Sequence, residues 1–166
     1  MKKTKEEPVP DRSPRAMETF PVSYAIFSVA RSHKALAGIL LRKLDLYPNQ
    51  DIILMALWNQ EGLAEKTLQE TLQVDHSTVA KSIKRMEAAG LLTSRKSDRD
   101  KRVTLVTLTA RGTEVYQKVV EAWADLERRT IQSLTVSEQA AFVVLAQKLE
   151  VPIREQLGLM ESENGI

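Results

Sequence analysis

The sequence contains no cysteine, and this excludes disulfides, thiolate metal sites and redox sensing through a thiol. A reducing compartment is compatible with that absence. No stretch approaches the roughly 18 uninterrupted apolar residues that a membrane-spanning helix needs, and the first 17 residues lack an apolar run that could act as a signal peptide. We therefore expect a cytoplasmic protein with no membrane partner.

Residues that build catalytic and metal sites are equally scarce. With only six glycines, the chain has no glycine-rich phosphate loop and no G-x-S-x-G nucleophile motif. The two histidines, His33 and His76, lack the spacing of a zinc site and have no cysteine to complete one. We therefore predict no catalytic residues, no metal and no cofactor.

What is present is enough for one main domain, since a chain of 166 residues with 43% hydrophobic content can bury a core. Residues 1–17 are rich in charge and proline, and we predict a flexible tail there. Apolar residues then recur at helical spacing, broken only near Tyr47-Pro48, so the segment 18–48 is predicted to be a long helix.

Three more helices are predicted from their caps and apolar spacing. Asn49 is a candidate cap for a helix that ends near Gly62, and a short helix follows at about 64–72. Asp75 is well suited to cap the next helix, which stops at Gly90. The buried stripe of this last helix is predicted to consist of Val79, Ile83 and Met86.

The chain from residue 91 alternates in the manner of a hairpin and then becomes helical again. Residues 91–95 and 102–108 are the predicted strands, with the bend at 97–101 between them. Thr109 is predicted to cap a helix of about 20 residues. A capping box at Thr135-Val136-Ser137-Glu138 opens a final helix that Pro152 ends or bends.

The helix pair around residue 74 and the hairpin after it form a helix-turn-helix followed by a wing. A recognition helix needs small side chains near its start, so that the backbone can enter the major groove, and longer donors further along. We expect Ser77, Thr78 and Lys81 to approach bases, and Arg85 to contact either a guanine or only a phosphate. The candidate DNA-binding residues of this helix are His76, Ser77, Thr78, Lys81, Ser82, Lys84 and Arg85.

Charge supports this interpretation. Net charge is only +2, but residues 76–102 contain eight basic and three acidic residues, a net +5, and the rest carries −3. A charged bend alone is usually a solvated turn, whereas a wing behind a recognition helix approaches the minor groove, which attracts arginine. We expect Arg99 and Arg102 there, with Asp100 able to limit the rotamers of an arginine. The candidate wing residues are Arg95, Arg99, Asp100, Lys101 and Arg102, with Arg95 and Lys101 expected on phosphates.

The segment VDHSTVAKSIKRMEAAGLLTSRKSDRDKRVTLVTLTARG resembles the recognition helix, wing and following junction of MarR-type transcription regulators. The resemblance extends over the helix order from about residue 20 to residue 159. It implies a mostly α fold, α+β by its small wing, with a winged helix-turn-helix at 49–109. The matching motifs are E-x-x-G-L (Glu87, Gly90, Leu91), R-D-x-R (Arg99, Asp100, Arg102) and L-T-x-x-G (Leu108, Thr109, Gly112).

The same resemblance implies the partners. It predicts a homodimer held by the segments 18–48 and 110–160, bound as a repressor to a near-palindromic double-stranded DNA operator and released by a small-molecule effector. An effector pocket between the dimerisation helices and the DNA-reading region would be lined by residues such as Ile26, His33, Trp58 and Trp123.

One position departs from the family pattern, because Ser97 stands where the wing of many members begins with an acid. Asp98 is one residue later, on the other face of a strand, and we do not expect it to replace that acid. Two other functions stay open on the residues alone. A winged helix can be a protein-interaction module, which needs no basic recognition face, and an enzyme would have to use carboxylates that solvation of amphipathic helices already explains.

Overall fold

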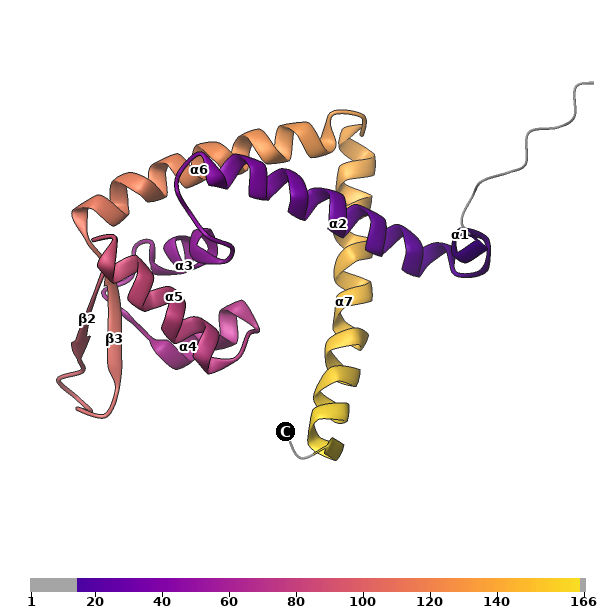
Figure 1. Cartoon of the computed structure of the whole chain (residues 1–166). Helices are drawn as coiled ribbons and strands as arrows, with labels where there is room; N and C mark the ends of the chain where they lie inside the picture. The colour runs from indigo at the N-terminus through magenta and orange to yellow at the C-terminus, as the bar shows by residue number, and fades with distance from the viewer. Residues whose placement is uncertain (1–14, 165–166) are drawn as a thin grey trace, which may run out of the picture. The chain divides into compact units, whose positions relative to one another are not determined.

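The computed structural model describes residues 15–164, with side chains described for residues 17–158. The chain divides into two compact units, one up to Ala122 and one from Trp123 onward, and each is described by itself. Helices dominate and are accompanied by one three-stranded antiparallel sheet (Figure 1), so the predicted fold class is confirmed.

The first unit opens with a short helix, α1 (Arg15–Thr19), and a long one, α2 (Pro21–Arg42). The predicted tail lies outside the described residues as far as residue 14, and its last residues belong to α1. The helical part of the chain therefore begins earlier than its composition indicated. Phe20, with φ −132° and ψ 62°, separates the two helices because the residue before a proline disfavours helical geometry.

Helix α2 ends at Arg42, earlier than the predicted end at residue 48. The chain leaves the helix through a turn in which Asp45 has a left-handed φ of 56°. The buried side chains at this end of α2 are Leu40 and Leu41, while most apolar side chains nearer its start are exposed. The helix is thus attached to the core of its unit only at its C-terminal end.

Helix α3 (Gln50–Leu57) also ends earlier than predicted. Asn49 occupies the N-cap position, but it has a left-handed φ of 69° and its side chain makes no capping hydrogen bond, so the predicted capping role is wrong. The side chain of buried Gln50 bonds to the loop before the helix, where its Oε1 accepts the backbone N–H of Tyr47 at 3.0 Å. A two-residue strand, β1 (Leu63–Ala64), precedes α4 (Glu65–Leu72) and was not predicted.

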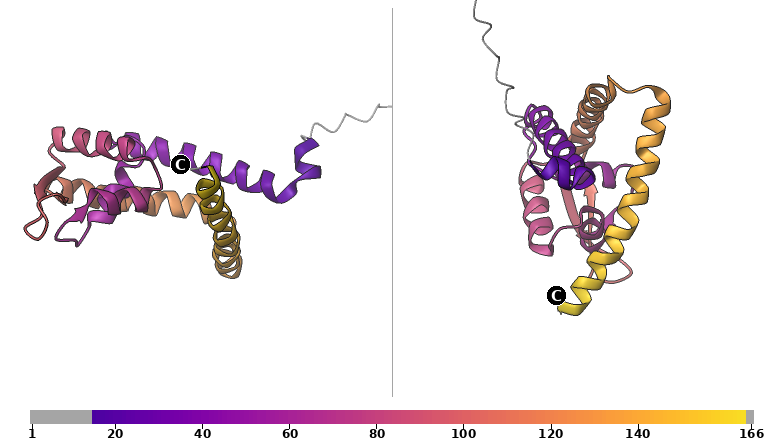
Figure 2. Two further views of the ribbon diagram at one scale, coloured as in Figure 1. Left: turned by 90° about the horizontal axis from the view of Figure 1, so that it is seen from below. Right: turned by 90° about the vertical axis from the view of Figure 1, so that its right-hand side faces the viewer.

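Helix α5 (His76–Ala88) and the hairpin of β2 (Leu92–Lys96) and β3 (Thr104–Leu108) follow the predicted order. The sheet has the order β1-β3-β2, with Val106 of β3 paired on one side with Leu63 and on the other with Ser94. In Figure 1 the turn of the hairpin extends beyond α5, and Figure 2 gives the same hairpin from two further directions.

The core of the first unit lies where α3, α4, α5 and the sheet meet. The predicted stripe of α5 is confirmed, because Val79, Ile83 and Met86 are at most 3% exposed. This packing fixes the rotation of α5 and turns its polar face outward. The other fully buried side chains are Ile53, Leu54, Leu57, Leu68, Val106 and Val119.

Helix α6 (Ala110–Ile131) crosses from the first unit into the second, which also contains α7 (Val136–Asn164). The predicted capping box is confirmed: Glu138 accepts the backbone N–H of Thr135 at 2.8 Å, and the Thr135 hydroxyl accepts the N–H of Glu138 at 3.3 Å. These contacts lower the pKa of Glu138, the backbone N–H contributing most.

Pro152 does not end α7, because the helix continues to Asn164. A proline inside a helix leaves the carbonyl four residues earlier without its partner. That carbonyl belongs to Lys148, which is exposed and can be hydrated. The missing hydrogen bond is therefore tolerated.

Candidate nucleic-acid interface

Asp75 organises the start of α5. One carboxylate oxygen accepts the Thr78 N–H at 2.9 Å and the Ser77 hydroxyl at 2.6 Å, and the other accepts the Thr78 hydroxyl at 2.6 Å. The predicted N-cap is therefore confirmed. These donors, the Ser77 hydroxyl first, hold the pKa of the Asp75 carboxyl well below its ordinary value. Both hydroxyl hydrogens point to Asp75, so each hydroxyl offers only lone pairs to a further partner.

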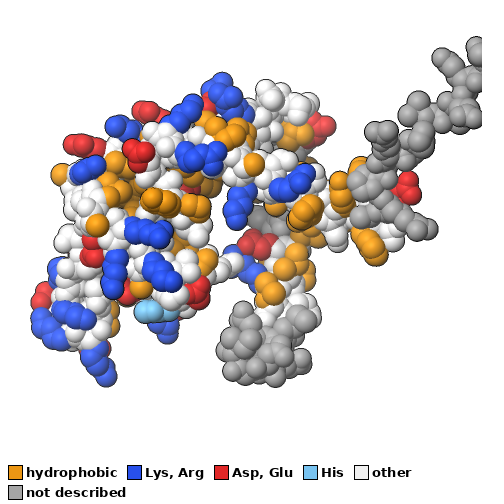
Figure 3. All heavy atoms as spheres, viewed as in Figure 1, with side chains coloured by type: hydrophobic (Ala, Val, Ile, Leu, Met, Phe, Trp, Pro, Cys, Tyr) orange, Lys and Arg blue, Asp and Glu red, His pale blue; other side chains and the backbone are white. Residues whose placement is uncertain are grey.

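Most of the predicted DNA-binding residues of α5 lie on the side opposite its buried stripe, while His76 and Ser82 flank the stripe. Five of them are exposed, while Thr78 and Ser82 are half-buried. Figure 3 shows Lys and Arg side chains gathered over α5 and the hairpin on one face of the molecule. The exposed five are His76, Ser77, Lys81, Lys84 and Arg85.

Two of these side chains contact residues of other elements. His76 Nε2 lies 4.0 Å from Glu65 Oε2 at the start of α4. The guanidinium of Arg85 lies over the ring of Tyr47, 5.2 Å from its centroid. Tyr47 is far from Arg85 in sequence, and no local pattern indicated this pair.

Two carboxylates organise the wing. Asp100 forms a two-pronged pair with Arg102, whose Nε and terminal nitrogen donate at 3.2 and 3.1 Å, and it also accepts the Arg102 N–H at 2.9 Å. The predicted pairing of Asp100 with an arginine is confirmed. The Arg102 side chain is the main cause of a lowered Asp100 pKa.

Asp98 also takes part, which corrects our expectation that it does not replace the missing acid. It bridges Arg95 at 3.2 Å and Lys101 at 3.0 Å. Asp98 lies in the turn rather than on a strand, so the strict alternation of strand faces does not apply to it. Ser97 has a different part, accepting the backbone N–H of Arg99 at 3.3 Å.

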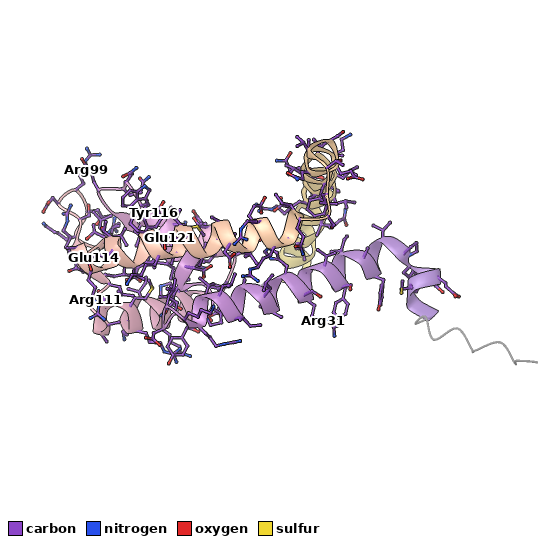
Figure 4. All side chains as sticks on the ribbon, turned by 90° about the horizontal axis from the view of Figure 1, so that it is seen from above. Arg31, Arg99, Arg111, Glu114, Tyr116 and Glu121 are labelled. Atoms are coloured by element: carbon purple, nitrogen blue, oxygen red, sulfur yellow. The ribbon has the colours of Figure 1, made fainter. Side chains whose placement is uncertain are left out.

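Arg99 differs from the other wing cations. Its side chain makes no hydrogen bond or ion pair with any described residue, and Figure 4 shows it projecting from the hairpin tip. The remaining cation, Lys96, donates to the Thr104 hydroxyl at 3.0 Å across the hairpin.

The base of the wing is joined directly to α6. The Thr109 hydroxyl contacts the carbonyls of Gly90 at 2.7 Å and Leu91 at 3.1 Å, and it accepts the Gly112 N–H at 2.9 Å. Thr109 is therefore a helix cap, as predicted. A Cβ at position 112 would lie 2.0 Å from the Leu91 oxygen, so this close approach requires glycine. The E-x-x-G-L and L-T-x-x-G motifs thus meet at this junction.

Three of the four predicted pocket residues belong to the first unit, and Trp123 belongs to the second. Ile26 is 46% exposed and His33 half-buried on α2. The ring of Trp58 stacks on Tyr116 of α6 at 4.3 Å and 13°, a contact without a sequence signal. Trp123 is half-buried in the second unit.

Among the described residues, no group of three or more His, Asp or Glu side chains is placed to hold a metal ion. No helix in the described part of the chain has the length and apolar character required to span a membrane.

Comparison with known sequences places this region in a family. Residues 46–104 match the model of the MarR family. The organic hydroperoxide resistance transcriptional regulator of Bacillus subtilis is 38% identical over 82 residues, 49% of this chain and 56% of that protein. The chain spans a little over half the length of the first curated relatives that it matches.

Two solved structures have the same fold. A mutant of MarR from E. coli complexed with operator DNA has a TM-score of 0.74 at 24% identity, over 82% of this chain and 99% of that one. BpsR from Bordetella bronchiseptica, whose DNA binding is regulated by 6-hydroxynicotinic acid, has a TM-score of 0.72 at 26% identity, over 78% and 92%. Residues 46–104 of the chain therefore match the MarR family, and the chain has the winged helix-turn-helix fold of these two structures.

Proposed function

We propose that this chain is a homodimeric transcription regulator that represses by binding a near-palindromic operator and is released by a small-molecule effector. The observation that carries the proposal is the pairing of an exposed polar and cationic face on α5 with a cationic hairpin beside it. A protein-interaction module would not need that charge. The proposal includes no catalytic step, and it puts the protein in the cytoplasm with the chromosome.

In this proposal α5 enters the major groove. Ser77, Thr78 and Lys81 approach base edges, while His76, Ser82 and Lys84 lie beside them along the groove. Arg99 and Arg102 of the wing then approach the adjacent minor groove. Asp100 already limits the rotamers of Arg102, so less entropy is lost on insertion. Arg95 and Lys101, held by Asp98, contact phosphates.

The dimer is supported by apolar surface that each unit leaves uncovered. At the start of α2, the capping residue Phe20 and the helical residues Val22 and Phe27 are each about 60% exposed. Exposed apolar patches of this kind are typical of association surfaces. A two-fold axis would put two copies of α5 about 34 Å apart, one turn of DNA. The exposed apolar residues of α7 include Phe142, Val143, Val144, Leu145, Leu149, Val151, Ile153 and Leu157.

The structurally similar proteins indicate only which class of molecule the effector belongs to. BpsR responds to 6-hydroxynicotinic acid, and PcaV from Streptomyces coelicolor, 26% identical, was solved with its natural ligand. A small organic molecule is therefore proposed as the effector here too. With no cysteine in the sequence, release by thiol oxidation is not part of the proposal.

The test is salt-dependent binding to the DNA upstream of this protein's own gene. Fluorescence anisotropy between about 50 and 200 mM salt should give an affinity that falls by orders of magnitude. Arg99→Ala should weaken binding and reduce the slope of log affinity against log salt by about one, because Arg99 is the wing arginine that has no acidic partner among the described residues. Lys118→Ala, which removes one exposed charge from α6, is the matched control and should leave the slope unchanged. No protection of that DNA in a low-salt footprint would refute the proposal.

A further inference from the structure

Tyr47 is an exposed aromatic residue on a backbone that is held firmly in place. It lies between α2 and α3, and its N–H donates to the Oε1 of Gln50 while its carbonyl accepts the Gln50 N–H at 3.2 Å. Gln50 is only 4% exposed, and the preceding Leu46 is 6% exposed. The backbone from which the Tyr47 side chain projects is therefore fixed, while the residue itself is 59% exposed.

The one side chain of the DNA-reading face that this ring contacts is Arg85. Its guanidinium carbon is 5.2 Å from the ring centroid, within the range of a cation–π contact. Arg85 lies in the last turn of α5, whereas base edges are read mainly from the start of a recognition helix. A guanidinium that lies over a ring uses its face and leaves its N–H edges available.

We propose that Tyr47 is a positioning residue for DNA binding: its ring holds Arg85 at the edge of the recognition face, where the guanidinium clamps a backbone phosphate and does not read guanine. This deepens the proposed function and rests on it. Two N–H groups of a fixed guanidinium match two oxygens of a phosphate. To reach a guanine, Arg85 would have to leave the ring and extend toward the base plane, and it would lose the contact with Tyr47.

The experiment uses the full-length protein and a labelled duplex that the wild type itself selects from a random pool. The variants are Tyr47→Phe, Tyr47→Leu, Arg85→Ala and the double variant Tyr47→Leu/Arg85→Ala. Tyr47→Phe keeps the ring and should bind within twofold of wild type, whereas Tyr47→Leu should bind about two- to fivefold more weakly. Arg85→Ala should lower the salt slope by about one.

The double variant should bind no more weakly than Arg85→Ala, because Tyr47 acts only through Arg85. An equal further loss in the double variant would overturn the proposal. Arg85→Ala should also weaken binding uniformly across single-base variants of the duplex. Loss of preference at one guanine would show readout and overturn it as well.

A measurement without DNA separates this proposal from the proposed function. The Nε–H resonance of Arg85 should carry a ring-current shift in the wild type and in Tyr47→Phe, and should lose it in Tyr47→Leu. Absence of the shift in the wild type would contradict the positioning role directly. If the shift is present but no duplex is selected at low salt, the proposed function fails and with it the phosphate clamp. Equal Tm values for Tyr47→Leu and wild type control for folding.

Discussion

Replacing Gly112 with alanine would place a methyl group where the wing junction has no room for one. Gly112 lies in the first turn of α6, and the new Cβ would be 2.0 Å from the Leu91 carbonyl oxygen, whereas real Cβ atoms essentially never come within 3.0 Å of such a neighbour. That oxygen also accepts the Thr109 N–H at 3.0 Å. Because the new Cβ would clash with a backbone atom, a change of side-chain rotamer cannot remove the clash. The start of α6 would have to move away from Leu91 at the base of the wing.

Two effects of opposite sign decide the magnitude. Alanine is favoured over glycine inside a helix by about 1 kcal/mol. Overpacking costs about 1–3 kcal/mol, and displacement of Thr109 weakens hydrogen bonds worth about 1 kcal/mol each. We therefore expect Gly112→Ala to lower the free energy of unfolding by about 1–3 kcal/mol. For a chain of this size the loss lowers Tm by about 3–10 °C.

Thermal unfolding followed by circular dichroism at one fixed protein concentration measures this, since the Tm of an oligomer depends on concentration. Gly38→Ala is the matched control in the interior of α2, where the new Cβ meets only the end of the Arg42 side chain at 3.6 Å. Helix propensity alone acts there, and Tm should rise by about 1–4 °C. A Tm for Gly112→Ala at or above that of wild type would refute the reasoning.

Three further outcomes are expected. The pKa of Asp75 is lowered on folding, so its stabilising contribution is complete above its ordinary value near pH 4 and declines as the pH falls below it. Asp75→Asn cannot titrate, and its Tm should fall less than that of wild type between about pH 4 and pH 2; parallel curves would contradict the capping role. Asp100→Ala should weaken DNA binding a few-fold, because Arg102 is then no longer held in position and loses more entropy on binding. If the negative charge of Asp100 mattered only by repelling DNA, its removal would tighten binding instead. Anisotropy titrations distinguish weaker from tighter binding. Because the Ser77 and Thr78 hydroxyls donate to Asp75, they can only accept from DNA. Removing the exocyclic amine of a contacted adenine should therefore lower the DNA affinity of the wild type but not that of Ser77→Ala/Thr78→Val. An equal loss of affinity in both proteins would refute the assignment of these hydroxyls as acceptors.

Elements whose starts carry a local chemical signal could be predicted from the sequence. Asp75, Thr109 and Thr135 each cap a helix as expected, because a short polar side chain satisfies free N–H groups within its own turn. The hairpin followed from alternation alone. The exposed polar face of α5 was predictable as well, since burial of the apolar stripe fixes which residues lie opposite to it.

Features that depend on contacts between distant segments were not predictable. The end of α2, the early end of α3 and the short strand β1 are decided by packing and by pairing with β3, 43 residues further on at Leu63↔Val106. The contact between Tyr47 and Arg85 is of the same kind. At Asn49 the left-handed backbone of the turn accompanies the loss of the capping bond that the residue type predicted.

The wing shows why counting charges is a poor guide to which cation meets DNA. Four of its basic side chains already have partners: Arg95 and Lys101 share Asp98, Arg102 is paired with Asp100, and Lys96 donates to a threonine hydroxyl. A paired cation keeps its position but brings its carboxylate close to the phosphates, so its net attraction is reduced. Arg99 brings no such acid, and its ordering on DNA costs only side-chain entropy. In the MarR-type arrangement proposed here, the salt slope of the wing should therefore be smaller than its number of cations, with Arg99 the largest single contributor.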